Sequence, residues 1–255
     1  MLPSSIKSLI LDMDGVLWRA SEPIGNLHDI FVRINDQGIK VAFATNNGTL
    51  TPDQYVLKLA RYGVHVKPGQ IITSAITVAY LLKSVFLTGG KVFAIGEDGL
   101  IEALVDQGFT VEQNTGSTDI CAVVVGLDRN ISFNKMAEAT ILVRNGIPFY
   151  ATNPDRTYPT PRGEIPGAGA WIGVIKTATD VDPVFAGKPL PVIFDLARLW
   201  LATSPEETLV VGDRISTDIV GGQAAGMRTA LVLTGVSSEE DGKCWKPKID
   251  IISPS

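Results

Sequence analysis

Short apolar runs in the first part of the chain end abruptly at polar residues and glycine. Residues 8–11 (SLIL) run into Asp-Met-Asp-Gly, and residues 40–44 (KVAFA) run into Thr-Asn-Asn-Gly. Runs of this kind are typical of strands in a buried parallel sheet. Between them, apolar residues at helical spacing predict a helix over residues 27–35, which Gly38 closes. The three segments form one strand–helix–strand unit.

The same pattern returns late in the chain. Residues 208–212 (TLVVG) and 229–233 (TALVL) predict two further strands, with a helix rich in alanine and glycine over residues 218–225 between them. Because strand–helix–strand crossovers are right-handed, we expect the N-terminal and C-terminal parts to share one doubly wound sheet.

The middle of the chain carries its own set of alternating elements. Strands are predicted at residues 91–95, 122–126 and 147–151, and helices at residues 100–107 and 134–145. A self-contained set of this kind indicates a second α/β domain inserted into the first. We therefore predict an α/β fold in which a Rossmann-like parallel sheet forms a core domain of residues 1–74 and 183–255, with an inserted domain of residues 75–182.

Charge and composition exclude several classes of function. The 255 residues carry a net charge of −5, so the chain lacks the basic field that binding to a nucleic acid requires. No apolar run reaches the roughly 20 residues that a bilayer needs, so we expect no membrane association. Asp12 and Asp14 interrupt the first apolar run, which is unlike a signal peptide and favours a cytoplasmic location. The two cysteines, Cys121 and Cys244, are expected to be reduced thiols.

Carboxylates follow two of the predicted strands. Asp12 and Asp14 share one side of an extended segment, because side chains two residues apart point the same way. Taken alone, this pair also fits a helix cap or a turn. Asp213, however, ends its strand as Asp12 does, so both side chains would enter the crevice at the strand ends. Three acids converging there suit Mg²⁺.

Other polar residues occupy neighbouring strand-to-helix corners. Asp218 lies one helical turn after Asp213 and either caps that helix or orients metal-bound water. Thr45, Asn46 and Asn47 offer hydroxyl and amide groups to an anion, although a polar turn explains them equally well. Lys188 stands before a proline and could offset negative charge, where a solvated surface lysine is the ordinary alternative.

Taken in order, the motifs DMDGV, ATNNG, GKP and GDRISTD resemble the four motifs of haloacid dehalogenase-like phosphatases. Three wider matches, ATNPD at 151–155, IPGAGA at 165–170 and LVLTGV at 231–236, resemble the NagD-like or 4-nitrophenylphosphatase subfamily. The resemblance covers nearly the whole chain. It implies that the inserted domain is a C2-type cap over the active site.

The resemblance also implies a role for each matching residue. Asp12 would be the nucleophile that forms an aspartyl-phosphate, and Asp14 would protonate the leaving oxygen and then activate water. Thr45, Asn46 and Asn47 would hold the phosphoryl group. Lys188 would neutralise charge as a catalytic and phosphate-binding residue. The implied Mg²⁺ ligands and supports are Asp12, Asp14, Asp213 and Asp218.

Three cap residues, Asn153, Asp155 and Tyr158, would face the substrate. Some family members carry histidine where Tyr158 stands, so the preference for a leaving group does not transfer. The resemblance also allows a homodimer formed through the cap.

Together these observations predict a Mg²⁺-dependent phosphatase that hydrolyses a small phosphomonoester through an aspartyl-phosphate. The alternatives are a phosphotransferase with an alcohol acceptor and a non-catalytic sensor of a phosphorylated metabolite. The chain has no P-loop, no dinucleotide fingerprint and no serine-hydrolase elbow. Of the tryptophans, Trp18 is expected near the mouth of the site, and Trp200, on a helix over residues 192–201, is expected in the core.

Overall fold

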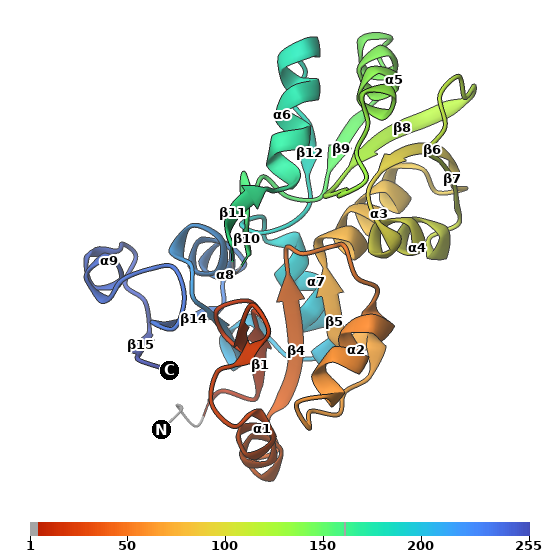
Figure 1. Ribbon diagram of the computed structural model, residues 1–255. Coiled ribbons are helices and arrows are strands. Elements are labelled where there is room, and N and C mark those ends of the chain that lie inside the picture. The colour runs from red at the N-terminus through yellow and green to blue at the C-terminus, as the bar shows by residue number, and fades with distance from the viewer. Residues whose placement is uncertain (1–4, 161) are drawn as a thin grey trace. The chain divides into compact units, whose positions relative to one another are not determined.

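The computed structural model describes residues 5–160 and 162–255 (Figure 1). The chain divides into two compact units. The first unit comprises the described part of residues 1–45, with residues 52–72 and 188–255, and the second comprises residues 46–51 and 73–187. The predicted core and cap boundaries stay a prediction, and the short segment 46–51 groups with the second unit.

The first unit contains a six-stranded sheet with parallel pairing around its centre. Its order is β15-β14-β13-β1-β4-β5. If the six strands of this sheet are numbered in chain order, their order across the sheet from β5 is 3-2-1-4-5-6, which is the order of dinucleotide-binding folds. The direction of winding therefore reverses between β1 and β13. The strands are β1 (Ser8–Leu11), β4 (Lys40–Thr45), β5 (Ile71–Thr73), β13 (Thr208–Gly212), β14 (Arg228–Val232) and β15 (Ile251–Ser253).

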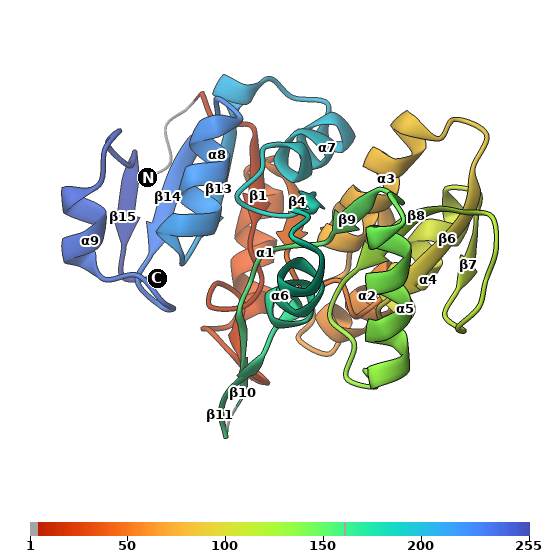
Figure 2. The same cartoon turned by 90° about the horizontal axis from the view of Figure 1, so that it is seen from above.

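Helices cover this sheet, and the predicted doubly wound α/β fold is confirmed. In Figure 2, α7 lies beside β1 and β4 and α8 lies beside β14, in agreement with their contacts. A short hairpin follows β1. The elements are β2 (Trp18–Arg19), β3 (Glu22–Pro23), α1 (Leu27–Asp36), α2 (Pro52–Ala60), α7 (Val192–Leu201), α8 (Val220–Ala224) and α9 (Glu239–Cys244), with 3-10 turns at Pro68–Gln70 and Pro205–Glu207.

The core of the first unit corrects one expectation. Helix α7 buries Ile193, Phe194, Ala197 and Leu201 against the sheet. Trp200, which we expected in the core, is 44% exposed. The buried positions recur every four residues at Ile193, Ala197 and Leu201, which leaves Trp200 at the border of the buried face.

The second unit contains a five-stranded sheet in the order β12-β9-β8-β6-β7, with parallel pairing. If the five strands of this sheet are numbered in chain order, their order across the sheet from β7 is 2-1-3-4-5, so the winding reverses between β6 and β8. The almost uniformly apolar run of β8 is buried on both faces, as expected of a central parallel strand. The strands are β6 (Gly90–Ile95), β7 (Phe109–Glu112), β8 (Ile120–Val125), β9 (Phe149–Ala151) and β12 (Val184–Phe185).

Two pairs of helices enclose this second sheet (Figure 1). Helices α3 (Ser74–Val85) and α4 (Asp98–Asp106) share one apolar cluster with it, and α5 (Phe133–Arg144) and α6 (Ala168–Thr179) share another. An exposed hairpin of β10 (Thr157–Thr160) and β11 (Gly163–Pro166) precedes α6. Within the described residues, no helix is both long and apolar enough to cross a membrane.

Candidate active site

Three carboxylates gather where the first sheet reverses its winding. Asp12 follows β1, Asp213 follows β13, and Asp218 lies in the π-helical turn Ile215–Ile219. Their possible ligand atoms all lie within 4.8 Å of one another. All three side chains are buried. The carboxyl ends of adjacent parallel strands thus bring together acids that lie two hundred residues apart, as their positions after two strands predicted.

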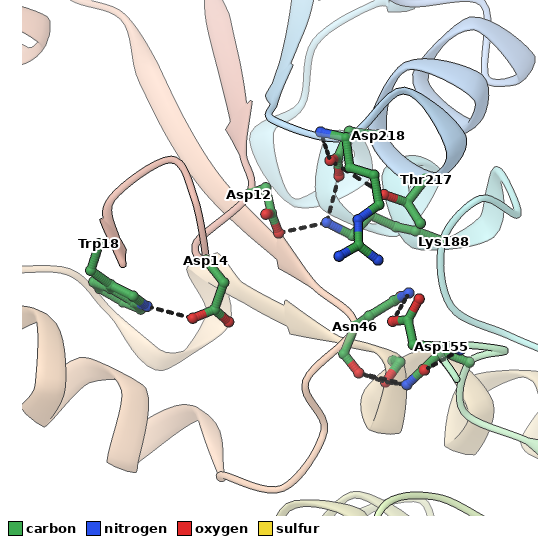
Figure 3. Close-up of polar contacts among 11 residues, drawn as sticks. Asp12, Asp14, Trp18, Asn46, Asp155, Lys188, Thr217 and Asp218 are labelled. Carbon is green, nitrogen blue, oxygen red and sulfur yellow. Dashed lines mark hydrogen bonds and ion pairs between the residues drawn. The ribbon is translucent and has the colours of Figure 1, made fainter. Parts of the chain in front are cut away.

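Lys188 lies between two of these acids (Figure 3). Its Nζ donates hydrogen bonds to Asp12 Oδ1 and Asp218 Oδ1, both at 2.6 Å. Lys188 is only 3% exposed, so it is not the solvated surface residue that the sequence left open. The three carboxylates and the Lys188 ammonium together carry two excess negative charges when all are ionised, and the partly buried Arg214 guanidinium offsets part of the charge of Asp213 from nearby.

Burial and mutual repulsion shift the proton affinities of the cluster. Burial raises the pKa of Asp12 well above its usual range; the Lys188 ammonium opposes this shift, and the charges of Asp218 and Asp213 add to it. Burial and the charge of Asp218 likewise raise the pKa of Asp213. For Lys188, burial disfavours the charged form, but the two carboxylates outweigh it and raise its pKa.

Close backbone packing fixes the Asp213 carboxylate. The Val236 N–H donates to Asp213 Oδ2 at 2.8 Å. A Cβ atom on Gly235 would lie 1.8 Å from the same oxygen, and one on Gly15, whose φ is +86°, would lie 2.6 Å from it. Only glycine allows the backbone to approach Asp213 this closely at these two positions.

The side chain of Asp218 is shared between Lys188 and the turn that carries it. Its Oδ2 accepts the Arg214 N–H at 3.1 Å and the Thr217 hydroxyl at 3.3 Å. Asp218 Oδ2 therefore holds the backbone at the start of its own turn, while Oδ1 binds Lys188. The π-helical turn Ile215–Ile219 occupies the start of the helix predicted from residue 218, and α8 begins only at Val220.

Asp14 lies outside the three-carboxylate group and has a different partner. The Trp18 indole N–H donates to Asp14 Oδ1 at 2.9 Å (Figure 3). Sequence reasoning placed Trp18 near the site but missed this bond, because only the turn between the two residues brings them together. Thr45, at the end of β4, is 2% exposed.

The other predicted substrate residues meet in a polar network of the second unit. The Asn46 carbonyl accepts hydrogen bonds from Ser74 Oγ at 2.6 Å and Asn153 Nδ2 at 2.7 Å. The Asn46 amide donates to Asp155 Oδ2 at 2.9 Å (Figure 3). Asn47 Nδ2 donates to Tyr158 Oη at 3.4 Å. Ser74 carried no sequence signal, since an isolated serine at a helix start has many ordinary roles.

Two family models match the chain. One, described as haloacid dehalogenase-like hydrolase, matches residues 9–110. The other, a HAD-hydrolase-like model, matches residues 185–255. The first match contains Asp12 and Asp14, and the second contains Lys188, Asp213 and Asp218.

Named relatives match over most of their length. The 5'-nucleotidase YutF of Bacillus subtilis is 36% identical over 92% of this chain and 90% of its own length. An acid sugar phosphatase of Staphylococcus aureus is 37% identical over 92% of this chain and 89% of its own.

Solved structures agree with the fold. NagD from Escherichia coli K-12 is 34% identical, with a TM-score of 0.89 over 98% of this chain and 96% of that one. The glycerol phosphate phosphatase Rv1692 of Mycobacterium tuberculosis, solved with magnesium, is 31% identical, with a TM-score of 0.91 over 97% of this chain and 74% of that one.

Proposed function

The chain belongs to the haloacid dehalogenase-like hydrolases, in their NagD-like branch, and from this membership we propose a Mg²⁺-dependent phosphatase with Asp12 as its nucleophile. The predicted family and the predicted class of enzyme, a phosphomonoester hydrolase, are confirmed by these relatives. One observation carries the proposed mechanism: Lys188 bridges Asp12 and Asp218 beside Asp213, in a buried cluster with excess negative charge.

The cluster fits the Mg²⁺ cofactor of this family. Its possible ligand atoms are all carboxylate oxygens, and its three buried acids outnumber the one buried lysine, which favours a hard divalent cation. Asp12, Asp213 and the Asp14 backbone carbonyl would hold the ion, with Asp218 supporting its bound water. When bound, the ion would neutralise charge that develops on the phosphoryl oxygens.

The residues of the first unit would then divide the chemistry between them. A carboxylate oxygen of Asp12 attacks phosphorus while the Lys188 ammonium offsets the negative charges that approach each other. Asp14 gives a proton to the leaving oxygen and later takes one from the attacking water. Thr45, Asn46 and Asn47 would bind the phosphoryl oxygens.

A small phosphorylated metabolite is the proposed substrate. The named relatives act on nucleotides, sugar phosphates and glycerol phosphate, which share a phosphomonoester and little else. Asn153, Asp155 and Tyr158 are the residues proposed to face the leaving group. A cytoplasmic location, the lack of a nucleic-acid partner and dimerisation through the cap stay predictions.

The test is release of 4-nitrophenol and phosphate from 4-nitrophenyl phosphate, with Mg²⁺ and with a chelator. We expect turnover that needs the metal, disappears in Asp12→Asn and persists in Asp36→Asn, an exposed control on α1. No turnover by folded wild-type protein, or full activity of Asp12→Asn, would overturn the proposal.

Adding alcohols to the same assay distinguishes hydrolysis from transfer. A phosphatase releases nitrophenol and phosphate in equal amounts, whereas a phosphotransferase releases less phosphate as the alcohol concentration rises. A panel of phosphorylated metabolites, assayed by phosphate release, would then identify the substrate.

A further inference from the structure

The Trp18 side chain is fully buried, and its one polar group, the indole N–H, is directed at the carboxylate of Asp14, the proposed general acid and base. The side chain is 0% exposed, and its N–H bonds Asp14 Oδ1 at 2.9 Å. Asp14 itself is only partly buried. A buried indole needs some acceptor, and a backbone carbonyl would serve as well. The choice of Asp14 as acceptor therefore calls for an explanation beyond packing.

Two neighbours hold the Trp18 ring in place. The Lys58 ammonium lies 3.8 Å from the ring centroid. The Tyr62 ring stacks on the indole with centroids 5.9 Å apart and an interplanar angle of 29°, and the Tyr62 hydroxyl donates to the Ser21 carbonyl at 2.7 Å. A cation over one part of the ring and a stacked aromatic resist its rotation. The N–H therefore keeps a fixed direction.

The backbone ties the two residues into one turn. The Gly15 N–H donates to the Trp18 carbonyl, and the Leu17 N–H donates to the Met13 carbonyl, both at 2.8 Å. Asp14 and Trp18 also form a β-bridge. Asp14 is thus held by its own backbone and, through Oδ1, by a ring that cannot easily turn.

The chemistry of indole gives the two oxygens of Asp14 different surroundings. Indole N–H is a donor only, so Asp14 Oδ1 accepts from it, and this bond directs Oδ2 as the oxygen for exchange with the substrate. We propose that Trp18 is a positioning residue that orients Asp14 so that Oδ2 exchanges protons with the substrate. This inference rests on the proposed function.

In the first half of the reaction, an Asp12 oxygen forms a bond to phosphorus as the bond from phosphorus to the ester oxygen breaks. The ester oxygen keeps the electron pair and takes the proton from Asp14 Oδ2. In the second half, water loses a proton to Oδ2 while its oxygen bonds phosphorus, and the bond between phosphorus and Asp12 breaks. Trp18 keeps its own proton throughout.

Leaving-group dependence separates positioning from packing. A poor leaving group needs the proton from Asp14, whereas 4-nitrophenolate departs with little help. The value of kcat/KM reports the steps up to departure of the leaving group. Removing the indole N–H should therefore harm substrates with less acidic leaving phenols most, while a loosened structure should harm all of them equally.

The experiment compares wild type and Trp18→Phe on a series from 4-nitrophenyl through 4-cyanophenyl to phenyl phosphate at saturating Mg²⁺. We expect the loss in kcat/KM to grow from about threefold to about thirtyfold along the series, below the full 10²–10⁴-fold effect of a general acid because Asp14 itself remains. Tyr62→Leu removes the stacking but keeps the N–H, and should show a smaller loss with a slope shallower than that of Trp18→Phe, because the indole is then held less firmly.

An equal loss along the series for Trp18→Phe, or a slope in Tyr62→Leu as steep as that of Trp18→Phe, would overturn the role of Trp18. If Trp18→Phe does not fold, benzothienylalanine at position 18 keeps the ring shape and replaces the N–H by sulfur, with the same expectations. Wild-type protein inactive on every member would instead overturn the proposed function.

Discussion

Each unit of this protein places a buried aspartate, paired with a lysine, just beyond a central strand of its parallel sheet. In the first unit, Asp12 follows β1 and bonds Lys188 at 2.6 Å. In the second, Asp128 lies just beyond β8 and bonds Lys135 at 2.7 Å. Both strands border the point where the winding of their sheet reverses. The two sites therefore share their place in the fold.

The two sites differ in charge balance. In the second unit the neighbouring acid, Glu97, has its own cation, because Arg129 Nε donates to Glu97 Oε1 at 2.8 Å and these hydrogen bonds lower the pKa of Glu97. In the first unit three buried carboxylates have one buried lysine and the partly buried Arg214 near Asp213, and burial raises the pKa of Asp12. The fold brings acidic side chains to the strand ends in both units. A metal cation is favoured only in the first unit, where buried carboxylates outnumber the buried lysine.

Removing each lysine should give the largest contrast. Lys188→Met removes the lysine that bonds Asp12 and Asp218 and takes charge stabilisation from the reaction, so we expect kcat to fall about 10²–10³-fold. Lys135→Met should leave kcat within about threefold, because its pair is not part of the proposed chemistry. Steady-state kinetics and thermal unfolding of both variants check this.

Both lysine variants should also lose stability, since each leaves a buried carboxylate unpaired, at a cost of about 3–5 kcal/mol for a fully buried pair. The loss should be smaller for Lys135→Met, whose lysine side chain is 22% exposed. Equal losses of activity in the two variants would break the contrast between the units.

The raised pKa values predict how stability without metal depends on pH. Below about pH 4, Asp12 and Asp213 are protonated in both the folded and the unfolded chain. Above that, the unfolded chain releases protons that the folded protein retains up to the raised pKa values. The folded state then binds more protons, so the free energy of unfolding falls as pH rises through this window.

Bound Mg²⁺ should offset the fall in the free energy of unfolding at higher pH. Thermal unfolding with and without the ion should show a larger gain near pH 8 than near pH 5, of about 2–3 kcal/mol at roughly 100 times the dissociation constant. Asp213→Asn should reduce the gain, and Asp128→Asn, in the balanced unit, should leave it unchanged. A gain that is equal at both pH values would contradict the unbalanced-charge interpretation.

A substitution in the polar network around Asn46 should have the smallest effect on catalysis. Asp155→Ala removes one acceptor for the Asn46 amide, a hydrogen bond worth about 1 kcal/mol, and should raise KM about fivefold. Asp155→Asn retains an acceptor oxygen and should stay within about twofold of wild type. An equal rise in KM for both variants would argue against a positioning role for this bond.

Sequence patterns located the strands that carry the acids because the apolar runs are long and end at polar motifs. Strand β1 and helix α7 match their predicted ranges. Strand β6 begins one residue earlier than predicted, and β14 lies one residue earlier at both ends. Strand β7 and the hairpin of β10 and β11 were not predicted, since partly or fully exposed strands lack a continuous apolar run.

Contacts between distant residues were beyond sequence reasoning. Asp218 was assigned to a cap or to metal-bound water, and its bond to Lys188 depends on how β13 and the segment before α7 meet in space. The placement of residues 46–51 with the second unit likewise depends on Ser74 and Asn153, which bind the Asn46 carbonyl from afar.

The most direct test is a search for the covalent intermediate. Protein quenched in acid during turnover of 4-nitrophenyl phosphate would be digested and its peptides weighed by mass spectrometry. We predict one added phosphoryl group on the peptide that contains Asp12, formed only with Mg²⁺ and absent from Asp12→Asn. A phosphoryl group on another residue, or phosphate release by Asp12→Asn at the wild-type rate, would contradict the assignment of Asp12 as the nucleophile.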